Sequence, residues 1–306
     1  MTTVAAIDCG TNSIKVLIAD VGAGALRVVL RDSRVVRLGQ GVDESGMLAE
    51  LALERTFAAL DEFAAVIRDH GVPPELTRFC ATSATRDASN SAVFTLGVRR
   101  RLGVEPEVLS GDEEAALVYA GAIAGLVAPS TEPVLVVDIG GGSTELVVGE
   151  GGGPRASISM NIGSVRLHER HLHSDPPTAA EVAACVADID RHLDGSGIAL
   201  GDVRSVIGTS GTIKTIACGV LALGDYDRNA FDRAELANDS ARDFSEGLLA
   251  MTVEERRALP YMHPGRADVI GAGALIWSRI LDRVPVDTHL ISEADILHGI
   301  AAAIAR

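Results

Sequence analysis

The chain has 306 residues, of which 47% are hydrophobic, and a formal net charge of −15. This composition is typical of a folded protein long enough for two domains, and its acidic balance argues against nonspecific nucleic-acid binding. No apolar run reaches the roughly 18 residues that a membrane helix needs, and a strand-like run begins the sequence, so we expect neither a membrane span nor a signal peptide. Four scattered cysteines without metal-ligand spacing favour buried thiols and a cytoplasmic location.

The first half of the chain is predicted to alternate strands with helices. Three apolar runs, at residues 4–8, 14–20 and 26–31, indicate an antiparallel meander. Apolar side chains at helical spacing then predict a helix over 50–69. The elements expected after it are a strand at 78–81, a helix that follows residue 90 and ends near Gly103, a strand at 107–109 and a helix opened by residues 110–113.

The second half repeats this plan after a proline-containing junction at 128–133. Thr178 and Glu181 have the spacing of a capping box and predict a helix start, and the last third is expected to be mostly helical. The other expected elements are strands near 134–138, 145–149, 155–160 and 203–207, a helix after the last of these, and a final helix over 293–305. We therefore predict two α/β domains, residues 1–127 and 128–306.

Two segments follow one pattern, an apolar strand, an Asp, a Gly-rich turn with Ser or Thr, and a second apolar strand. They are residues 8–13, Asp-Cys-Gly-Thr-Asn-Ser, and residues 138–145, Asp-Ile-Gly-Gly-Gly-Ser-Thr-Glu. Such a turn offers backbone N–H groups and hydroxyls to an anion. The repetition predicts two similar half-molecules that bind a phosphate from both sides.

Three carboxylates belong to these turns and are candidate metal ligands. Asp138 and Glu145 would lie across from each other in a hairpin, and Asp8 is the matching residue of the first turn. Mg²⁺ prefers a few carboxylates together with phosphate oxygens and water, so these residues predict an Mg²⁺ site, with Mn²⁺ as an alternative. The competing interpretation is an ordinary tight turn with a solvated Glu.

Residues 110–115, Ser-Gly-Asp-Glu-Glu-Ala, open a predicted helix and carry a candidate catalytic acid. Ser110 and Glu113 have capping-box spacing, so Glu113 is expected to reach back to the N-cap amide. Glu114 is not needed for capping and could orient or deprotonate a water. Alternatively, both acids only complement the helix dipole.

The remaining candidates are phosphate ligands. Asn12 is alternatively a left-handed turn residue, the Ser210 segment an ordinary N-cap, and each arginine a surface residue. Arginine suits bidentate phosphate contacts, and small residues at a helix start leave N–H groups available to anions. The candidates are Asn12, Ser13, Arg37, Arg86, Gly140, Gly141, Gly142, Ser143, Arg166, Ser210, Gly211, Lys214 and Arg266.

With these motifs, the sequence resembles the exopolyphosphatase/guanosine pentaphosphate phosphohydrolase family of the actin-like ATPase superfamily. The resemblance covers essentially the whole chain, although the long members continue into helical C-terminal domains. The segment 292–299 also departs from the more usual basic ending of the family at that point. The matching motifs lie at 8–13, 81–86, 110–115, 138–145, 163–166 and 208–212, with further family positions at 266–268 and 291–293.

The resemblance implies a role for each matching residue. It implies that Glu114 is the catalytic base, and that Asp138 and Glu145 hold Mg²⁺ and position water. It gives the phosphate-cradling role to Asn12 and Ser13 in the first turn and to residues 140–143 in the second, with Arg86 as a phosphate ligand. It also implies a pair of ribonuclease H-like domains with the active site in the interdomain cleft, and a final helix that packs back on the first domain.

We therefore expect an exopolyphosphatase that releases orthophosphate from the ends of inorganic polyphosphate. Guanosine pentaphosphate 5′-phosphohydrolase is the alternative within this class. An ATP-dependent small-molecule kinase and a non-catalytic polyphosphate or alarmone sensor are the alternatives from other classes. We expect a homodimer and no nucleic-acid or membrane partner, while a monovalent-cation requirement stays open.

Overall fold

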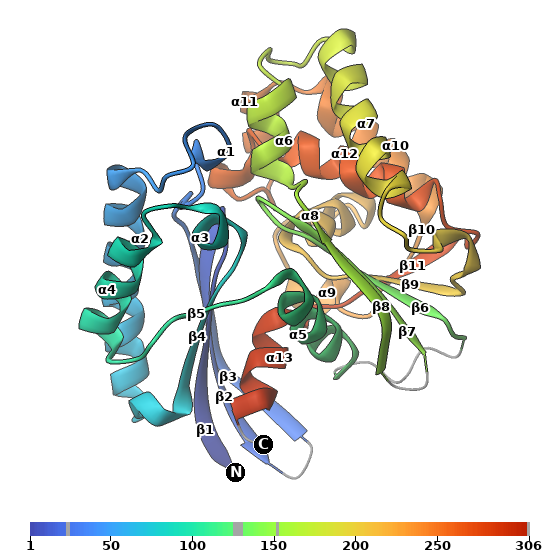
Figure 1. The fold of residues 1–306 in the computed structure, drawn as a ribbon. Helices are drawn as coiled ribbons and strands as arrows, with labels where there is room; N and C mark the ends of the chain where they lie inside the picture. The colour runs from blue at the N-terminus through green and yellow to red at the C-terminus, as the bar shows by residue number, and fades with distance from the viewer. Residues whose placement is uncertain (23–24, 125–130, 151–152, 305–306) are drawn as a thin grey trace. The chain divides into compact units, whose positions relative to one another are not determined.

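The computed structural model describes residues 1–22, 25–124, 131–150 and 153–304, and the chain divides into two units, each with its own sheet (Figure 1). Unit 1 comprises residues 1–124 and 294–306, and unit 2 comprises residues 125–293. Of the expected junction at 128–133, residues 128–130 lie outside the described residues.

The sheet of unit 1 has the strand order β3-β2-β1-β4-β5. The first three strands are antiparallel neighbours, which confirms the predicted meander, and β4 and β5 run parallel to β1. Parallel strands end at the same edge of a sheet, so the loops that follow β1, β4 and β5 are brought together there. The strands are β1 (Thr2–Cys9), β2 (Ser13–Gly22), β3 (Ala25–Val35), β4 (Thr77–Ala81) and β5 (Glu107–Val108).

Helices cover both faces of this sheet (Figure 1). On one face, Ala5 and Ile7 of β1 share a buried core with Leu60 and Phe63 of α2, as the helical spacing over 50–69 predicts. The other face is covered by α13, which contacts β1, β2 and β4, and α5 packs against α13. The helices of unit 1 are α1 (Val42–Ser45), α2 (Glu50–Asp69), α3 (Ser83–Asp87), α4 (Ser91–Leu102), α5 (Gly111–Ala124) and α13 (Ile296–Ile304), with a 3₁₀ turn η1 (Pro74–Leu76).

Helices α5 and α13 cross at two glycines, Gly121 and Gly299. A Cβ atom built on Gly121 would lie 1.9 Å from the carbonyl oxygen of Asp295, and one built on Gly299 would lie 2.1 Å from that of Leu117. Real Cβ atoms do not approach backbone so closely, so only glycine permits this packing. The crossing packs the C-terminal helix against α5, the helix whose first turn contains Glu114.

The sheet of unit 2 has the order β10-β11-β9-β6-β7-β8. Strands β6, β7 and β8 form an antiparallel meander, β9 and β11 run parallel to β6, and β10 adds an antiparallel edge. Without β10, the order repeats that of unit 1, which confirms the ribonuclease H-like class for both units. The strands are β6 (Val134–Ile139), β7 (Thr144–Glu150), β8 (Gly153–Met160), β9 (Ser205–Gly208), β10 (Glu235–Ala237) and β11 (Thr288–Ile291).

Helices make up most of the last third of the chain, as expected, and the predicted capping box of Thr178 and Glu181 is present at the start of α7. The expectation omitted β10 and β11, which are too short to show an alternating pattern. No helix of the described residues is long and apolar enough to span a membrane. The helices of unit 2 are α6 (Ser164–His171), α7 (Ala179–Asp194), α8 (Gly211–Val220), α9 (Arg228–Phe231), α10 (Asn238–Ala250), α11 (Val253–Arg257) and α12 (Ile270–Leu281), with 3₁₀ turns η2 (Leu200–Asp202) and η3 (Pro264–Arg266).

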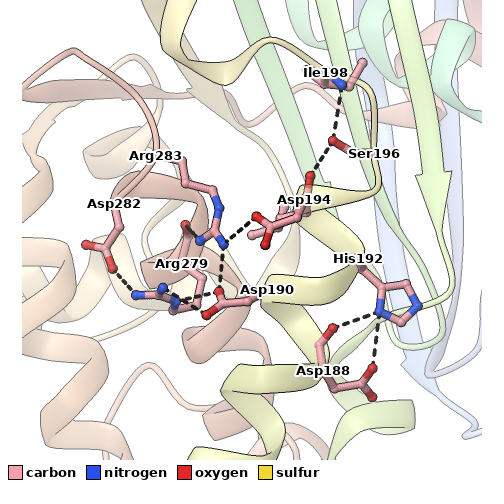
Figure 2. A network of polar contacts seen from close by, with 10 residues as sticks. Asp188, Asp190, His192, Asp194, Ser196, Ile198, Arg279, Asp282 and Arg283 are labelled. Atoms are coloured by element: carbon pink, nitrogen blue, oxygen red, sulfur yellow. Dashed lines mark hydrogen bonds and ion pairs between the residues drawn. The ribbon is translucent and has the colours of Figure 1, made fainter.

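A polar network joins α7 to the end of α12 (Figure 2). Asp190 accepts from Arg279 at 2.9 Å and lies 3.0 Å from Arg283, which also reaches Asp194 at 3.1 Å. These groups are partly exposed, so the network stabilises the helix pair modestly. The charged side chains of this network pair with one another, and none of these residues was a candidate for the functional site.

We predict that Gly299→Ala destabilises unit 1. The added methyl group would meet the Leu117 carbonyl, and overpacking of this kind typically costs about 1–3 kcal/mol. Gly247→Ala is the matched control, because Gly247 lies within α10 and its Cβ would meet nothing within 4 Å. Urea denaturation measures both. A Gly299→Ala protein as stable as the control would contradict this account of the crossing.

Candidate active site

The first glycine-rich turn joins β1 to β2. The Gly10 N–H donates to the Ser13 carbonyl at 3.0 Å, which closes the turn. The carbonyls of Thr11 and Asn12 then accept hydrogen bonds of 2.9–3.0 Å from N–H groups of residues 36–39. The segment after β3 thereby binds the carbonyl oxygens of the turn, and the N–H groups of Thr11 and Asn12 donate to no acceptor among the described residues.

This turn also carries buried polar atoms without partners. Among the described residues, Thr11 Oγ1 and Asn12 Oδ1 are buried and make no hydrogen bond, and the same holds for Thr85 Oγ1 in α3, the short helix after β4. Buried polar atoms are almost always paired in folded proteins, so orphaned ones mark a place for a ligand or water. The turn therefore fits a polar ligand, in agreement with its predicted phosphate role.

The second turn, between β6 and β7, is built in the same way. Gly140 N–H donates to the Ser143 carbonyl at 2.9 Å, and the carbonyls of Gly140 and Gly141 accept from the first residues of α6 at 2.9–3.1 Å. Arg166 Nε donates to the Gly142 carbonyl at 2.8 Å. Within the described part of the chain, the N–H groups of residues 141–143 donate to no acceptor. Consecutive N–H groups of this kind form a concave site for an anion.

A glycine from the segment after the third strand packs closely against each turn. A Cβ on Gly39 would lie 2.4 Å from Thr11 Cγ2, and a Cβ on Gly163 would lie 2.5 Å from the carbonyl carbon and oxygen of Gly141. Both glycines follow the third strand of their meander. The two halves of the chain therefore repeat the supporting residue as well as the turn itself.

The hairpins differ in the residue opposite the leading aspartate. Asp138 pairs with Glu145 across β6 and β7, so both side chains lie on one face of the sheet beside the turn. Asp8 pairs with Lys15 across β1 and β2, and its carboxylate accepts from Lys15 Nζ at 2.9 Å. Unit 2 thus presents two carboxylates where unit 1 presents an ion pair.

The carboxylate pair fits a divalent cation. Glu145 is 2% exposed, and its carboxylate accepts from Ser159 Oγ at 2.7 Å, which fixes its orientation. The described residues contain no group of three or more His, Cys, Asp and Glu side chains arranged to hold a metal. Mg²⁺ does not require such a cage, because it takes one or two carboxylates and completes its shell with phosphate oxygens and water.

At the start of α5, two adjacent glutamates have different environments. Glu113 caps the helix as predicted, because its carboxylate accepts from the Ser110 N–H at 2.8 Å and Ser110 Oγ accepts from the Glu113 N–H. These hydrogen bonds from Ser110 lower the pKa of Glu113 below its usual value. Glu114 is 6% exposed, and its carboxylate lies 3.1 Å from Arg86 Nη1.

The other predicted phosphate ligands lie mainly in unit 2. Ser210 caps α8, and its Oγ accepts from the Ile213 N–H. A Cβ on Gly211 would lie 2.5 Å from a guanidinium nitrogen of Arg266, so these two candidates are in contact. Lys214 is buried, and its Nζ donates to the Glu293 carbonyl at 2.7 Å and lies 3.0 Å from the carboxylate of the same residue.

In unit 1, Arg37 adopts a left-handed backbone with φ of 51°, which is uncommon for a residue other than glycine. Its N–H donates to the Asn12 carbonyl at 2.9 Å, so this conformation holds the first turn. Non-glycine residues in this region gather at functional sites.

The structure thus brings the candidates together in four sets, two in each unit. In unit 1, Asp8, Asn12, Ser13 and Arg37 meet at the turn, and the pair Arg86–Glu114 lies at the ends of the neighbouring parallel strands. In unit 2, one set lies around the second turn and another around the start of α8. The set around the second turn comprises Asp138, Gly140, Gly141, Gly142, Ser143, Glu145 and Arg166. The set around the start of α8 comprises Ser210, Gly211 and Arg266.

Two further features at this site were not among the candidates. They are the unpartnered hydroxyl of Thr85 and the ammonium of Lys15 beside Asp8, whereas Thr11 belongs to the turn that the sequence predicts to bind phosphate oxygens. The position of Lys15 could have been found from sequence, because it stands seven residues after Asp8, as Glu145 stands after Asp138. Thr85 lies within the matching motif at 81–86, but nothing in its spacing singles it out.

Two α/β units with paired glycine-rich turns define a phosphate-handling protein of the ribonuclease H-like class. Residues 17–305 match the model of the Ppx/GppA phosphatase family. Over 320 aligned residues, the chain is 42% identical to Exopolyphosphatase 2 of Mycobacterium tuberculosis, and the match covers 100% of this chain and 99% of that one. The chain belongs to the Ppx/GppA phosphatase family.

Two further comparisons agree with this assignment. A crystal structure of an exopolyphosphatase-like protein superposes with a TM-score of 0.93 at 43% identity, over 98% of this chain and 97% of that chain. The guanosine-5′-triphosphate,3′-diphosphate pyrophosphatase of Vibrio atlanticus is 34% identical over 301 residues, which cover 97% of this chain but only 58% of that protein.

We predict that Gly163→Ala impairs phosphatase activity. The added methyl group would collide with the Gly141 backbone, so the second turn must shift away from its present geometry. We expect a loss of kcat of about tenfold or more, equivalent to roughly 1.4 kcal/mol of transition-state stabilisation. The control is Gly201→Ala, whose Cβ would meet nothing within 4 Å. A Gly163→Ala enzyme with wild-type kcat would contradict the supporting role of this residue.

Proposed function

We propose that this chain is an exopolyphosphatase, which hydrolyses the terminal phosphoanhydride bond of inorganic polyphosphate and releases orthophosphate. The observation that carries the proposal is the pair of turns whose carbonyls accept hydrogen bonds while the N–H groups of residues 11–12 and 141–143 donate to no acceptor among the described residues. The M. tuberculosis relative, named as an exopolyphosphatase, matches the full length of the chain and supports the choice of substrate.

In this proposal, Glu114 is the general base. Its carboxylate takes a proton from the water that attacks the terminal phosphorus. A new P–O bond forms, the bridging P–O bond breaks, and the shortened chain leaves as an anion. The N–H groups of residues 141–143 and of the first turn bind non-bridging oxygens and stabilise the charge that develops on them.

A divalent cation is part of the same proposal. Phosphatases of this family generally depend on a divalent metal. We assign Mg²⁺, with Mn²⁺ as the alternative, to Asp138 and Glu145, where it would neutralise charge on the transferring phosphate. Asp8 is the third predicted ligand, and there a cation would compete with Lys15 for the carboxylate.

Guanosine pentaphosphate is the second candidate substrate. The relative of V. atlanticus carries a guanosine-5′-triphosphate,3′-diphosphate pyrophosphatase name and aligns with nearly all of this chain. Polyphosphate is preferred because the match covers nearly all of the exopolyphosphatase relative, whereas this chain spans little more than half of the V. atlanticus protein. Orthophosphate release from short polyphosphate, long polyphosphate and guanosine pentaphosphate, assayed side by side, distinguishes the two. Transfer of phosphate to an added acceptor, without release of orthophosphate, would instead favour a kinase.

We predict that Glu114→Gln lowers kcat for polyphosphate by about 10²-fold or more, because the attacking water loses its base. The neighbouring Glu113→Gln is the matched control. It replaces a capping carboxylate with an amide that can still accept from the Ser110 N–H, so it should lower stability only slightly, with little effect on kcat. Steady-state orthophosphate release and urea denaturation measure the two effects. An inactive Glu113→Gln enzyme beside an active Glu114→Gln enzyme would reverse our assignment.

We also predict that excess EDTA abolishes orthophosphate release and that Mg²⁺ restores it. Asp138→Asn should raise the Mg²⁺ concentration for half-maximal activity by about tenfold or more, because it removes one of two charged ligands. Asp8→Asn should raise it less, since Lys15 already pairs with that carboxylate. Full activity in EDTA would rule out a metal at Asp138 and Glu145.

A further inference from the structure

Arg86 bridges two elements at the end of the unit 1 sheet. It lies in α3, the short helix that follows β4. Its Nη1 atom donates to the Leu109 carbonyl at 2.8 Å and to a carboxylate oxygen of Glu114 at 3.1 Å. The carbonyl anchors the guanidinium just before α5 begins, and the guanidinium in turn reaches the carboxylate in the first turn of α5.

Burial makes this contact important for Glu114. The side chain of Glu114 is 8% exposed and that of Arg86 is 24% exposed. A carboxylate withdrawn from water needs a partner to remain ionised, and a neighbouring guanidinium, which is always charged, provides one. A proton-accepting role requires that ionised form.

The neighbouring glutamate shows what the contact adds. Glu113 stands on the same helix turn, lies in solvent and is bound by Ser110. The start of α5 therefore separates two adjacent acids, one that caps the helix and one that is held by an arginine from another element.

We propose that Arg86 is a positioning residue that keeps Glu114 ionised and oriented toward the attacking water. This proposal rests on the proposed function, in which Glu114 is the base. It replaces direct phosphate binding, expected for Arg86 from the sequence, as the main role of this residue. The two roles predict different kinetics, because a positioning residue acts on kcat and its pH dependence and a phosphate ligand acts chiefly on KM.

The test is the pH dependence of kcat for orthophosphate release from a short polyphosphate at saturating Mg²⁺. For Arg86→Gln we expect the acid limb of the profile to move up by about one pH unit, because Glu114 loses its cationic partner. Near neutral pH, kcat should fall by about tenfold. Arg86→Lys retains a positive charge and should leave the limb close to that of the wild-type enzyme.

Two controls complete the experiment. Arg78→Gln removes an arginine of the same sheet that pairs with Glu107 at 2.7 Å, and it should leave the limb unmoved. In a Glu114→Gln background, Arg86→Gln should change the residual kcat by less than about twofold, since its effect passes through the missing carboxylate. If Arg86→Gln alone prevents folding because it leaves the buried Glu114 carboxylate without its arginine, the double variant can still be measured, since it lacks that carboxylate.

The position of the acid limb decides the outcome. A limb that stays in place in Arg86→Gln, whatever happens to KM, overturns the positioning role, and a raised KM with this result would indicate a phosphate ligand. Wild-type activity of Glu114→Gln would instead refute the base assignment of the proposed function, so the two failures are distinguishable.

Discussion

The site depends on one arrangement of hydrogen bonds, in which the carbonyls of each glycine-rich turn are bound by the segment that follows the third strand. Residues 36–39 do this for the first turn, and the start of α6 does it for the second. Once these oxygens are engaged, the N–H groups of residues 11–12 and 141–143 are the donors left for a ligand. The supporting glycines, the left-handed Arg37 and the meander order of both sheets all maintain this arrangement.

The two halves repeat the scaffold but differ in charge. Where one hairpin sets Glu145 opposite its aspartate, the other sets Lys15. The lysine supplies a fixed positive charge beside the first turn, and the carboxylate pair can take a mobile cation beside the second. A protein of net charge −15 must bind a polyanion through local positive charge, which Lys15 supplies beside the first turn and which the proposed divalent cation would supply beside the second.

Local pattern predicted a large part of this site from the sequence. The two hairpins, the order of strands and helices, and the separation of Glu113 from Glu114 by capping-box spacing all follow from residues close in the chain. The ion pair of Arg86 with Glu114 joins residues 28 positions apart, and that of Lys214 with Glu293 joins residues 79 apart. No periodicity encodes such pairs, because they arise when parallel strands bring distant loops together. The strand β11 was not predicted for a related reason. It has only four residues, and their extended conformation depends on the neighbouring strands of the sheet.

The central claim is that water attacks the terminal phosphorus of polyphosphate. Hydrolysis in ¹⁸O-labelled water, followed by ³¹P NMR of the products, tests it most directly. The account predicts one ¹⁸O atom in each released orthophosphate and none in the shortened chain. Label found in the remaining chain instead, or orthophosphate released without label, would contradict attack by water at the terminal phosphate.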